Sequence, residues 1–186
     1  MDKDRIKEDY RQHTILAAWH DGKFRGKVWK EKVVVHEMEG PDISSTVIRL
    51  RRFIDKQIDA ACLEAGHTPD ESRVLEGLRC IIDKLHDGQR AMLKAHYHAK
   101  NQTLTAGELA EAAGYVSHSP VNIHYGNVGK ALYELAPIVL PKRKDGTPIY
   151  TCYLADASKD GEDEEYWHWK LRPEVSKAIA ALGLDA

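Results

Sequence analysis

The sequence contains little cysteine and no cysteine motif. Three cysteines, Cys62, Cys80 and Cys152, are spread over the 186 residues and form no Cys-X-X-Cys pair. An odd number of widely separated cysteines argues against a disulfide framework and against a zinc site. We therefore expect three reduced, buried thiols.

Long apolar runs are also missing. No stretch approaches the roughly 18 apolar residues of a membrane-spanning helix, and the charged N-terminal stretch MDKDRIKEDYRQ lacks the apolar core of a secretion signal. We expect a cytoplasmic protein with no membrane partner. A hydrophobic content of 42% and a charged content of 30% are ordinary for one large or two small globular domains.

The chain has no large excess of charge of one sign. Its formal net charge is −2, so the overall charge does not favour nucleic acid as a partner. The charges are unevenly distributed, however, with five basic residues between Lys23 and Lys32 and six acids between Asp156 and Glu165. Each run could orient a partner or could be a solvated loop.

Catalytic motifs are absent as well. The chain has neither a glycine-rich phosphate loop nor a Gly-X-Ser-X-Gly motif. His96 and His98 are two residues apart and therefore lie about 200° apart around a helix, which is wrong for a shared metal. We expect His96 in the core or at its boundary, and we expect no enzyme and no cofactor.

The N-terminal part, residues 1–66, predicts a small α+β unit. Residues 4–11 are expected to form a short polar helix or a frayed arm, and two or three antiparallel strands should follow from His13. Asp21-Gly22 is typical of a two-residue hairpin turn. Apolar periodicity predicts a helix over 43–65. Its expected apolar face consists of Val47, Leu50, Ile54, Ile58 and Leu63.

Three acids stand at the expected end of these strands. Glu37, Glu39 and Asp42 could hold a magnesium ion. A Gly40-Pro41-Asp42 turn with acids that cap the next helix explains the same residues more simply.

The stretch 102–136 predicts a helix-turn-helix motif. Its first helix should open at Thr105, and Gly114 stands where a C-terminal cap would lie. Ser119 is expected to cap the second helix and Pro120 to take its first position. The apolar stripe of the second helix consists of Val121, Tyr125, Val128, Leu132 and Leu135.

Residues 67–186 together predict a mainly helical, winged-helix-like domain. Thr68 is expected to cap its first helix after a linker at Ala65–Pro69. A β-hairpin over 149–171 should follow the helix-turn-helix, and a last helix should begin at Pro173. The two strands of the hairpin are expected in the segments IYTCYLA and YWHWKLR. The expected fold class of the whole chain is therefore α+β.

The outer face of the second motif helix is a candidate recognition surface. It carries Asn127 and Lys130, with Asn122 at one flank; asparagine can pair with adenine, and lysine with phosphate or guanine. Gly126 and Gly129 would each cost this helix about 1 kcal/mol relative to alanine. Their presence indicates that a backbone, either of DNA or of a neighbouring helix, approaches closely.

The region from about 88 to 184 contains a spread of short motifs that belong together. They are Ala95-His96-Tyr97, Leu104-Thr105, Glu108-Leu109-Ala110, Ala113-Gly114-Tyr115, Asn122, Tyr125-Gly126, Val128-Gly129, Trp169–Val175, Ala178 and Leu182-Gly183. On these residues the region resembles an accessory module of bacterial HNH-type endonucleases and restriction proteins. The resemblance implies a DNA-directed module in defence or mobile-element biology. It does not imply catalysis, because no separate nuclease segment is present.

A second basic surface is expected in the N-terminal unit, where alternate residues of one strand and a helix face carry positive charge. Backbone phosphates would suit it, as would an acidic protein. The neighbouring aromatic residues Trp19, Phe24 and Trp29 could be ordinary packing. The basic residues are Lys23, Arg25, Lys27, Arg49, Arg52 and Lys56.

These patterns lead to three hypotheses. The first is a non-enzymatic DNA-binding protein. The second is a protein-binding regulator or inhibitor, of the kind carried by phages, that uses its helical domain and the acidic loop. The third is a metal-dependent nuclease. For the first, the expected DNA contacts are Ser119, Asn122, Asn127, Lys130, Lys142, Arg143 and Lys144.

Overall fold

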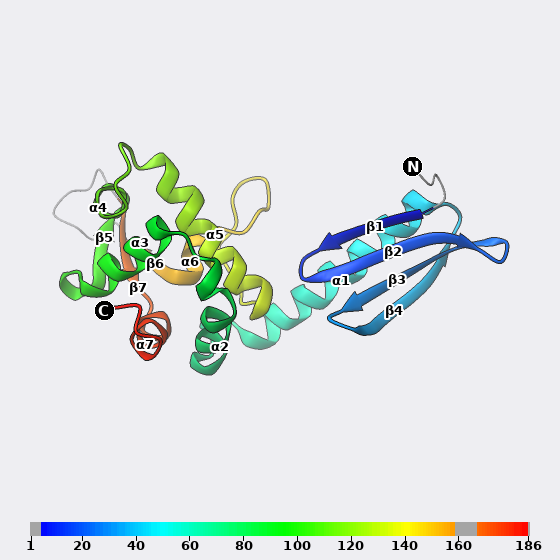
Figure 1. The fold of residues 1–186 in the computed structure, drawn as a ribbon, viewed down its shortest axis with the longest axis horizontal. Coiled ribbons are helices and arrows are strands. Elements are labelled where there is room, and N and C mark those ends of the chain that lie inside the picture. The colour runs from blue at the N-terminus through cyan, green and yellow to red at the C-terminus, as the bar shows by residue number, and fades with distance from the viewer. Residues whose placement is uncertain (1–4, 159–166, 186) are drawn as a thin grey trace. The chain divides into compact units, whose positions relative to one another are not determined.

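The computed structural model describes residues 5–158 and 167–185 and has the expected α+β class (Figure 1). The chain forms two compact units, residues 1–61 and 62–186. The division falls within helix α1 (Ile43–Ala65). None of the described helices is both long and apolar enough to cross a membrane.

Unit 1 contains an antiparallel sheet in the order β1-β2-β3-β4. Its strands are β1 (Arg5–Tyr10), β2 (His13–His20), β3 (Lys23–Lys30) and β4 (Val33–Gly40). The expected turn at Asp21-Gly22 is confirmed, since both residues have positive φ, 49° and 80°. The prediction of a helix or frayed arm over residues 4–11 is wrong for Arg5–Tyr10, because these residues form a strand that pairs with β2 along its whole length.

Helix α1 has the predicted bounds and packs on one face of this sheet (Figure 1). The buried Ile15, Ala17 and Val28 of the strands and the buried Leu50 and Ile54 of α1 form the core of unit 1. The main-chain N–H of Ser45 donates to the Asp42 carboxylate over 2.7 Å, which confirms an acidic cap at this turn. The Ser45 hydroxyl also donates to this carboxylate over 2.6 Å, and the side-chain and main-chain hydrogen bonds from Ser45 together lower the pKa of Asp42.

Unit 2 is mainly helical. The bounds of its described elements are α2 (Glu71–Ile81), η1 (Ile82–Lys84), α3 (Asp87–His98), η2 (Lys100–Gln102), β5 (Thr103–Thr105), α4 (Ala106–Ala112), α5 (Ser119–Leu135), α6 (Thr151–Leu154), β6 (Ala155–Ser158), β7 (His168–Leu171) and α7 (Pro173–Ala181).

The helix-turn-helix is formed by α4 and α5. A capping box links Thr105 and Glu108 at the start of α4. At its end Gly114 has a φ of 71°, and Tyr115 N–H donates to the Ala110 carbonyl over 2.8 Å. These two features are those of a Schellman motif, which confirms the predicted glycine cap. Gly114 thereby turns the chain toward α5.

Two predicted helix caps are wrong. His118, not Ser119, is the N-cap residue of α5, and it makes no side-chain cap. Asp70, not Thr68, caps α2 through the N–H of Arg73. Short polar residues close together in sequence compete for a cap, and local spacing alone does not decide between them.

A second sheet lies in unit 2, with the antiparallel order β5-β7-β6. The predicted hairpin begins only at Ala155, because Thr151–Leu154 forms the helical turn α6 where a strand was expected. The Tyr153 hydroxyl donates to the Ala136 carbonyl, so this turn is held by packing against α5. Strand β5 was not predicted.

The end of α1 belongs to unit 2. Cys62 is buried, and its sulfur lies 3.3 Å from the Tyr133 hydroxyl of α5. Leu63, predicted for the buried face of α1, is instead 79% exposed, and Leu135 of α5 is 42% exposed. All three cysteines are free, but Cys80 is exposed and Cys152 half-buried, so the expectation of three buried thiols is correct only for Cys62.

Candidate nucleic-acid interface

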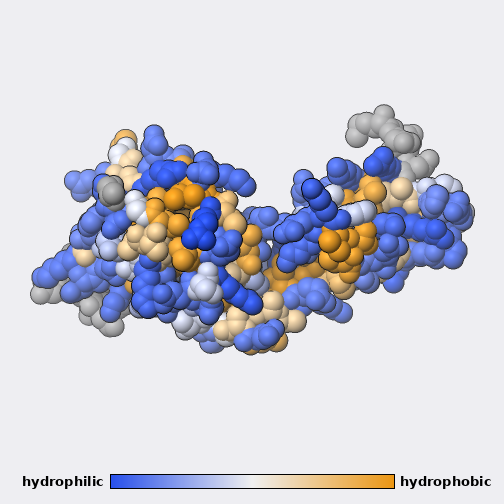
Figure 2. All heavy atoms as spheres, turned by 60° about the horizontal axis from the view of Figure 1, so that its bottom comes forward, coloured by the Kyte–Doolittle hydropathy of each residue, from blue (hydrophilic) through white to orange (hydrophobic). Residues whose placement is uncertain are grey.

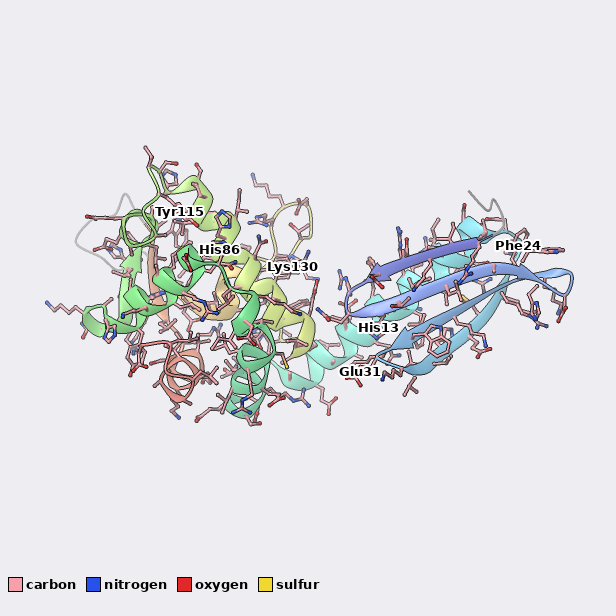
Figure 3. All side chains as sticks on the ribbon, viewed as in Figure 1. His13, Phe24, Glu31, His86, Tyr115 and Lys130 are labelled. Carbon is pink, nitrogen blue, oxygen red and sulfur yellow. The ribbon has the colours of Figure 1, made fainter. Side chains whose placement is uncertain are left out.

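Helix α5 presents a polar outer face. Ser119, Ile123, Asn127 and Lys130 are exposed and lie within about 80° of one another around the helix. The expected apolar stripe is confirmed for Val121, Tyr125, Val128 and Leu132, which are buried on the opposite side. Figure 3 marks Lys130 on α5. Its ammonium group lies 4.0 Å from the Glu134 carboxylate on the same helix.

The two glycines of α5 have different surroundings. A Cβ added to Gly129 would overlap the main-chain carbonyl oxygen of Tyr150, whereas one added to Gly126 would lie 3.7 Å from the Thr151 methyl group. The close backbone approach expected at Gly129 is therefore made by the chain's own segment at the start of α6. Gly126 makes only ordinary van der Waals contact.

A buried hydrogen-bond chain fixes α5 against α3 and β7. His96 is fully buried, as expected. Its Nε2 lies 2.7 Å from the Trp169 carbonyl, and its Nδ1 lies 2.7 Å from the Tyr125 hydroxyl. A carbonyl can only accept, so Nε2 carries the proton and Nδ1 accepts from Tyr125. Burial lowers the pKa of His96 and raises that of Tyr125, so both are neutral at neutral pH.

A second pair of contacts joins α5 to the start of α3. His86 Nε2 lies 3.1 Å from His124 Nδ1, and the Gln89 side chain donates to the His124 carbonyl over 3.1 Å. His86 also caps α3 by accepting from Gln89 N–H. Figure 3 marks His86 and, near the turn before α5, Tyr115. These contacts hold the N-terminal half of α5 in place.

The segment between α5 and α6 carries three consecutive cations. Lys142, Arg143 and Lys144 are exposed, and none of them makes a salt bridge with an acid in the described part of the chain. An isolated bridge pairs Lys142 with Pro148, and Asp145 binds back to Thr147. We call residues 141–149 the basic loop. Tyr150, which follows it, lies against Gly129 of α5.

The strand cations of unit 1 are arranged differently. Lys23, Arg25 and Lys27 project from one face of β3, as predicted, because they alternate with the buried Gly26 and Val28. The register of β3 with β4 places Glu39 and Glu37 opposite them. Lys23 and Arg25 bind Glu39 at 2.7 and 3.3 Å, and Lys27 binds Glu37 at 2.9 Å. The hydrogen bond from Lys23 lowers the pKa of Glu39.

We call Lys23, Arg25 and Lys27, with their acidic partners, the β3 ladder. The cations of helix α1 do not form one continuous patch with it. Helix α1 covers the sheet face that carries Val28, so the exposed Arg52 and Lys56 lie on the other side of unit 1 from the ladder. Only Arg49 reaches β4, where its guanidinium donates to the Glu39 carbonyl over 3.3 Å. The expected second basic patch is thus divided, and its strand half is neutralised by acids.

Asn122 lines a pocket and lies on a different side of α5 from Asn127. The pocket has a volume of about 1050 Å³ and lies beside α4, the turn before α5 and the second sheet. Asn122 is about 140° around α5 from Asn127.

The acidic run expected to meet a partner falls mainly on residues 159–165, outside the described residues. Its first acid, Asp156, binds Arg172 over 2.7 Å.

The described residues contain no group of three or more histidine, cysteine, aspartate or glutamate side chains that could hold a metal ion. Glu37 and Glu39 are engaged by the cations of β3, and Asp42 caps α1. These contacts account for the three acids that were candidate magnesium ligands.

No protein-family model, curated protein or solved structure matches the chain.

The buried state of His96 leads to a prediction about pH. The pKa of His96 is lowered below the ordinary value of 6.5 in the folded protein, so the unfolded chain binds a proton that the folded one does not. The stabilising contribution is therefore complete above about pH 6.5 and is lost as the pH falls below it, by at most about 1.4 kcal/mol per pH unit.

Urea denaturation of the wild type and of His96→Gln between about pH 7.5 and 5.5 measures this contribution. We expect the difference in unfolding free energy between the two proteins to shrink toward low pH. If Gln does not permit folding, an NMR titration of the His96 ring supplies the same information. A difference independent of pH, or a ring that titrates normally, would contradict the prediction.

Proposed function

We propose that the protein binds DNA without catalysing a reaction, through the outer face of α5 and the basic loop of unit 2. Asn127 and Lys130 would approach base edges or phosphates, and Lys142, Arg143 and Lys144 would contact phosphates. The link to bacterial defence or mobile elements rests on the resemblance to the endonuclease accessory module and belongs to the same proposal.

The observation that carries this proposal is the contrast between the two sets of cations. Each cation of the β3 ladder already has a carboxylate partner within 3.3 Å. The three cations of the basic loop have no such partner among the described residues. A phosphate can bind the loop without displacing an acid of the described residues, whereas it would have to displace Glu37 or Glu39 at the ladder.

The order of elements supports the same interpretation. Helices α3, α4 and α5 are followed by the hairpin β6–β7, and β5 between α3 and α4 completes the sheet. This is the order of a winged helix, in which the second helix of the helix-turn-helix is the one placed in the major groove. The face of α5 that would enter the groove carries no acid up to Lys130.

A matched pair of triple variants tests the proposal in the full chain. We expect K142A/R143A/K144A to weaken binding to mixed-sequence duplex DNA roughly 10- to 100-fold at low salt, because three phosphate contacts are lost. The control is K23A/R25A/K27A, which changes the net charge equally but removes cations that are already paired. Fluorescence anisotropy with labelled duplex measures both.

The two triple variants should differ clearly. A smaller loss in the ladder variant than in the loop variant supports the proposed surface. Equal losses would mean that only net charge matters, and absence of wild-type binding at about 50 mM salt would rule out the proposed function.

A second candidate function, protein binding, is favoured by one specific observation. Ile123 lies in the middle of the outer face of α5 and is 61% exposed. Figure 2 shows apolar residues at the surface of each unit among largely hydrophilic ones. An exposed isoleucine between polar residues suits an apolar partner better than a phosphate backbone. In the anisotropy experiment, Ile123→Ser should leave DNA affinity nearly unchanged if Ile123 serves a protein partner.

A further inference from the structure

The pocket beside α4 has a composition that suits a cation. Its walls include the aromatic residues Tyr115, Trp167 and Trp169 and the carboxylates Glu108 and Glu111. Among the described residues that line it there is no lysine and no arginine. A phosphate would meet two carboxylates there and neither lysine nor arginine among the described lining residues, so the pocket does not suit the DNA backbone.

The two carboxylates of the pocket differ in how they are used. One oxygen of Glu108 accepts from the N–H and the hydroxyl of Thr105 at 2.7 and 2.9 Å, so this side chain is held by the capping box of α4. The carboxylate of the exposed Glu111 makes no hydrogen bond or salt bridge with another described residue. Glu111 therefore offers a carboxylate that an incoming cation can engage without breaking a contact to any described residue.

The aromatic wall is partly fixed and partly accessible. The Trp169 ring stacks on the Tyr125 ring with centroids 5.9 Å apart, and the Trp169 carbonyl is bound by His96. Trp167 is 53% exposed. Aromatic faces attract a guanidinium or ammonium group, and arginine in particular can stack on a ring while its N–H groups bind a carboxylate.

We propose that this pocket receives an arginine side chain from a basic segment of a partner protein. The guanidinium would stack on Trp167 or Trp169 and bind the Glu111 carboxylate. The hydroxyls of Thr103 and Ser117 and the amide of Asn122, which also line the pocket, would bind the neighbouring peptide groups. This site is separate from the α5 face and does not depend on DNA binding.

The experiment uses the indole N–H signals of the full, ¹⁵N-labelled chain. The four tryptophans comprise Trp19 and Trp29 in unit 1 and Trp167 and Trp169 at the pocket. The probe is the peptide acetyl-Gly-Arg-Gly-amide, and the control is the same peptide with citrulline, which has the shape of arginine without its charge. The variant Trp167→Phe lacks the indole N–H signal of Trp167 and thereby helps to assign the two pocket signals.

We expect the arginine peptide to shift the signals of Trp167 and Trp169 with a dissociation constant of ~1 mM, and to leave those of Trp19 and Trp29 unchanged. Citrulline should shift neither pair. Glu111→Gln should weaken binding roughly 3- to 5-fold, as expected for an exposed ion pair. The matched control is Glu76→Gln, since Glu76 is exposed on α2 and pairs with Arg79.

Several outcomes would overturn the proposal. Equal shifts from the citrulline peptide would show that charge plays no part, and equal effects of Glu111→Gln and Glu76→Gln would exclude Glu111 as the partner of the guanidinium. Shifts of Trp167 and Trp169 by duplex DNA but not by the arginine peptide would assign the pocket to nucleic acid. The first two outcomes do not bear on whether the α5 face and the basic loop bind DNA.

Discussion

His96→Ala is expected to destabilise unit 2 by about 3–5 kcal/mol. His96 is fully buried and joins the Tyr125 hydroxyl to the Trp169 carbonyl, each over 2.7 Å. Alanine would remove the hydrogen-bond partner of the Tyr125 hydroxyl and one hydrogen bond to the Trp169 carbonyl, and it would open a cavity between α3, α5 and β7. Urea denaturation followed by tryptophan fluorescence and far-ultraviolet circular dichroism measures the loss.

Two controls separate the hydrogen bonds from general damage. Tyr125→Phe removes one hydroxyl and should cost about 1–2 kcal/mol, while His98→Ala changes an exposed side chain and should cost under about 0.5 kcal/mol. The double variant of His96 and Tyr125 should lose less unfolding free energy than the sum of the two single losses, because the two side chains are joined by one hydrogen bond. A His96→Ala protein within about 1 kcal/mol of the wild type would contradict this account of the core.

Substitution of the two α5 glycines should have opposite effects. Alanine at Gly129 would place its Cβ on the carbonyl oxygen of Tyr150 and 2.9 Å from the carbonyl carbon. Backbone cannot yield as a flexible side chain does, so we expect a loss of about 2–4 kcal/mol in unfolding free energy. Gly126→Ala meets only a methyl group at 3.7 Å and should gain about 0.5–1 kcal/mol from the higher helix propensity of alanine.

Thermal and urea denaturation of both alanine variants test this difference. The comparison is well matched, because the residues are about one turn apart in the same helix and the chemical change is identical. A Gly129→Ala protein as stable as Gly126→Ala would mean that α6 does not pack closely on α5. The basic loop would then lose the contact at Tyr150 that fixes its end against α5.

Regular helices were predictable from the sequence because their signals are local. The apolar spacing in α1 indicated its bounds, and the glycine at 114 indicated the Schellman turn before α5. Strand β1 has only two apolar side chains, Ile6 and Tyr10, so its identity depends on pairing with β2. Segment Thr151–Leu154 has residues typical of a strand, but packing of Tyr153 on α5 makes it helical.

The candidate sites likewise differ in whether local sequence signals could predict them. The outer face of α5 follows from helical geometry and could be predicted. The neutralisation of Lys23, Arg25 and Lys27 could not, because it depends on the register of β3 with β4, which includes an irregularity after Val28. The pocket combines residues from α4, the turn before α5 and β7, so no local pattern indicates it.

The most direct test of the central claim is the salt dependence of DNA binding by the wild type and by K142A/R143A/K144A, measured with the full chain between about 50 and 200 mM salt. If the basic loop contacts three phosphates, the slope of log K against log salt concentration should be shallower in the variant by about 2.7, at about 0.9 for each contact. The ladder variant K23A/R25A/K27A should keep the wild-type slope. Identical slopes for the wild type and the loop variant would show that the basic loop does not bind the DNA backbone, and the proposed interface would then be wrong.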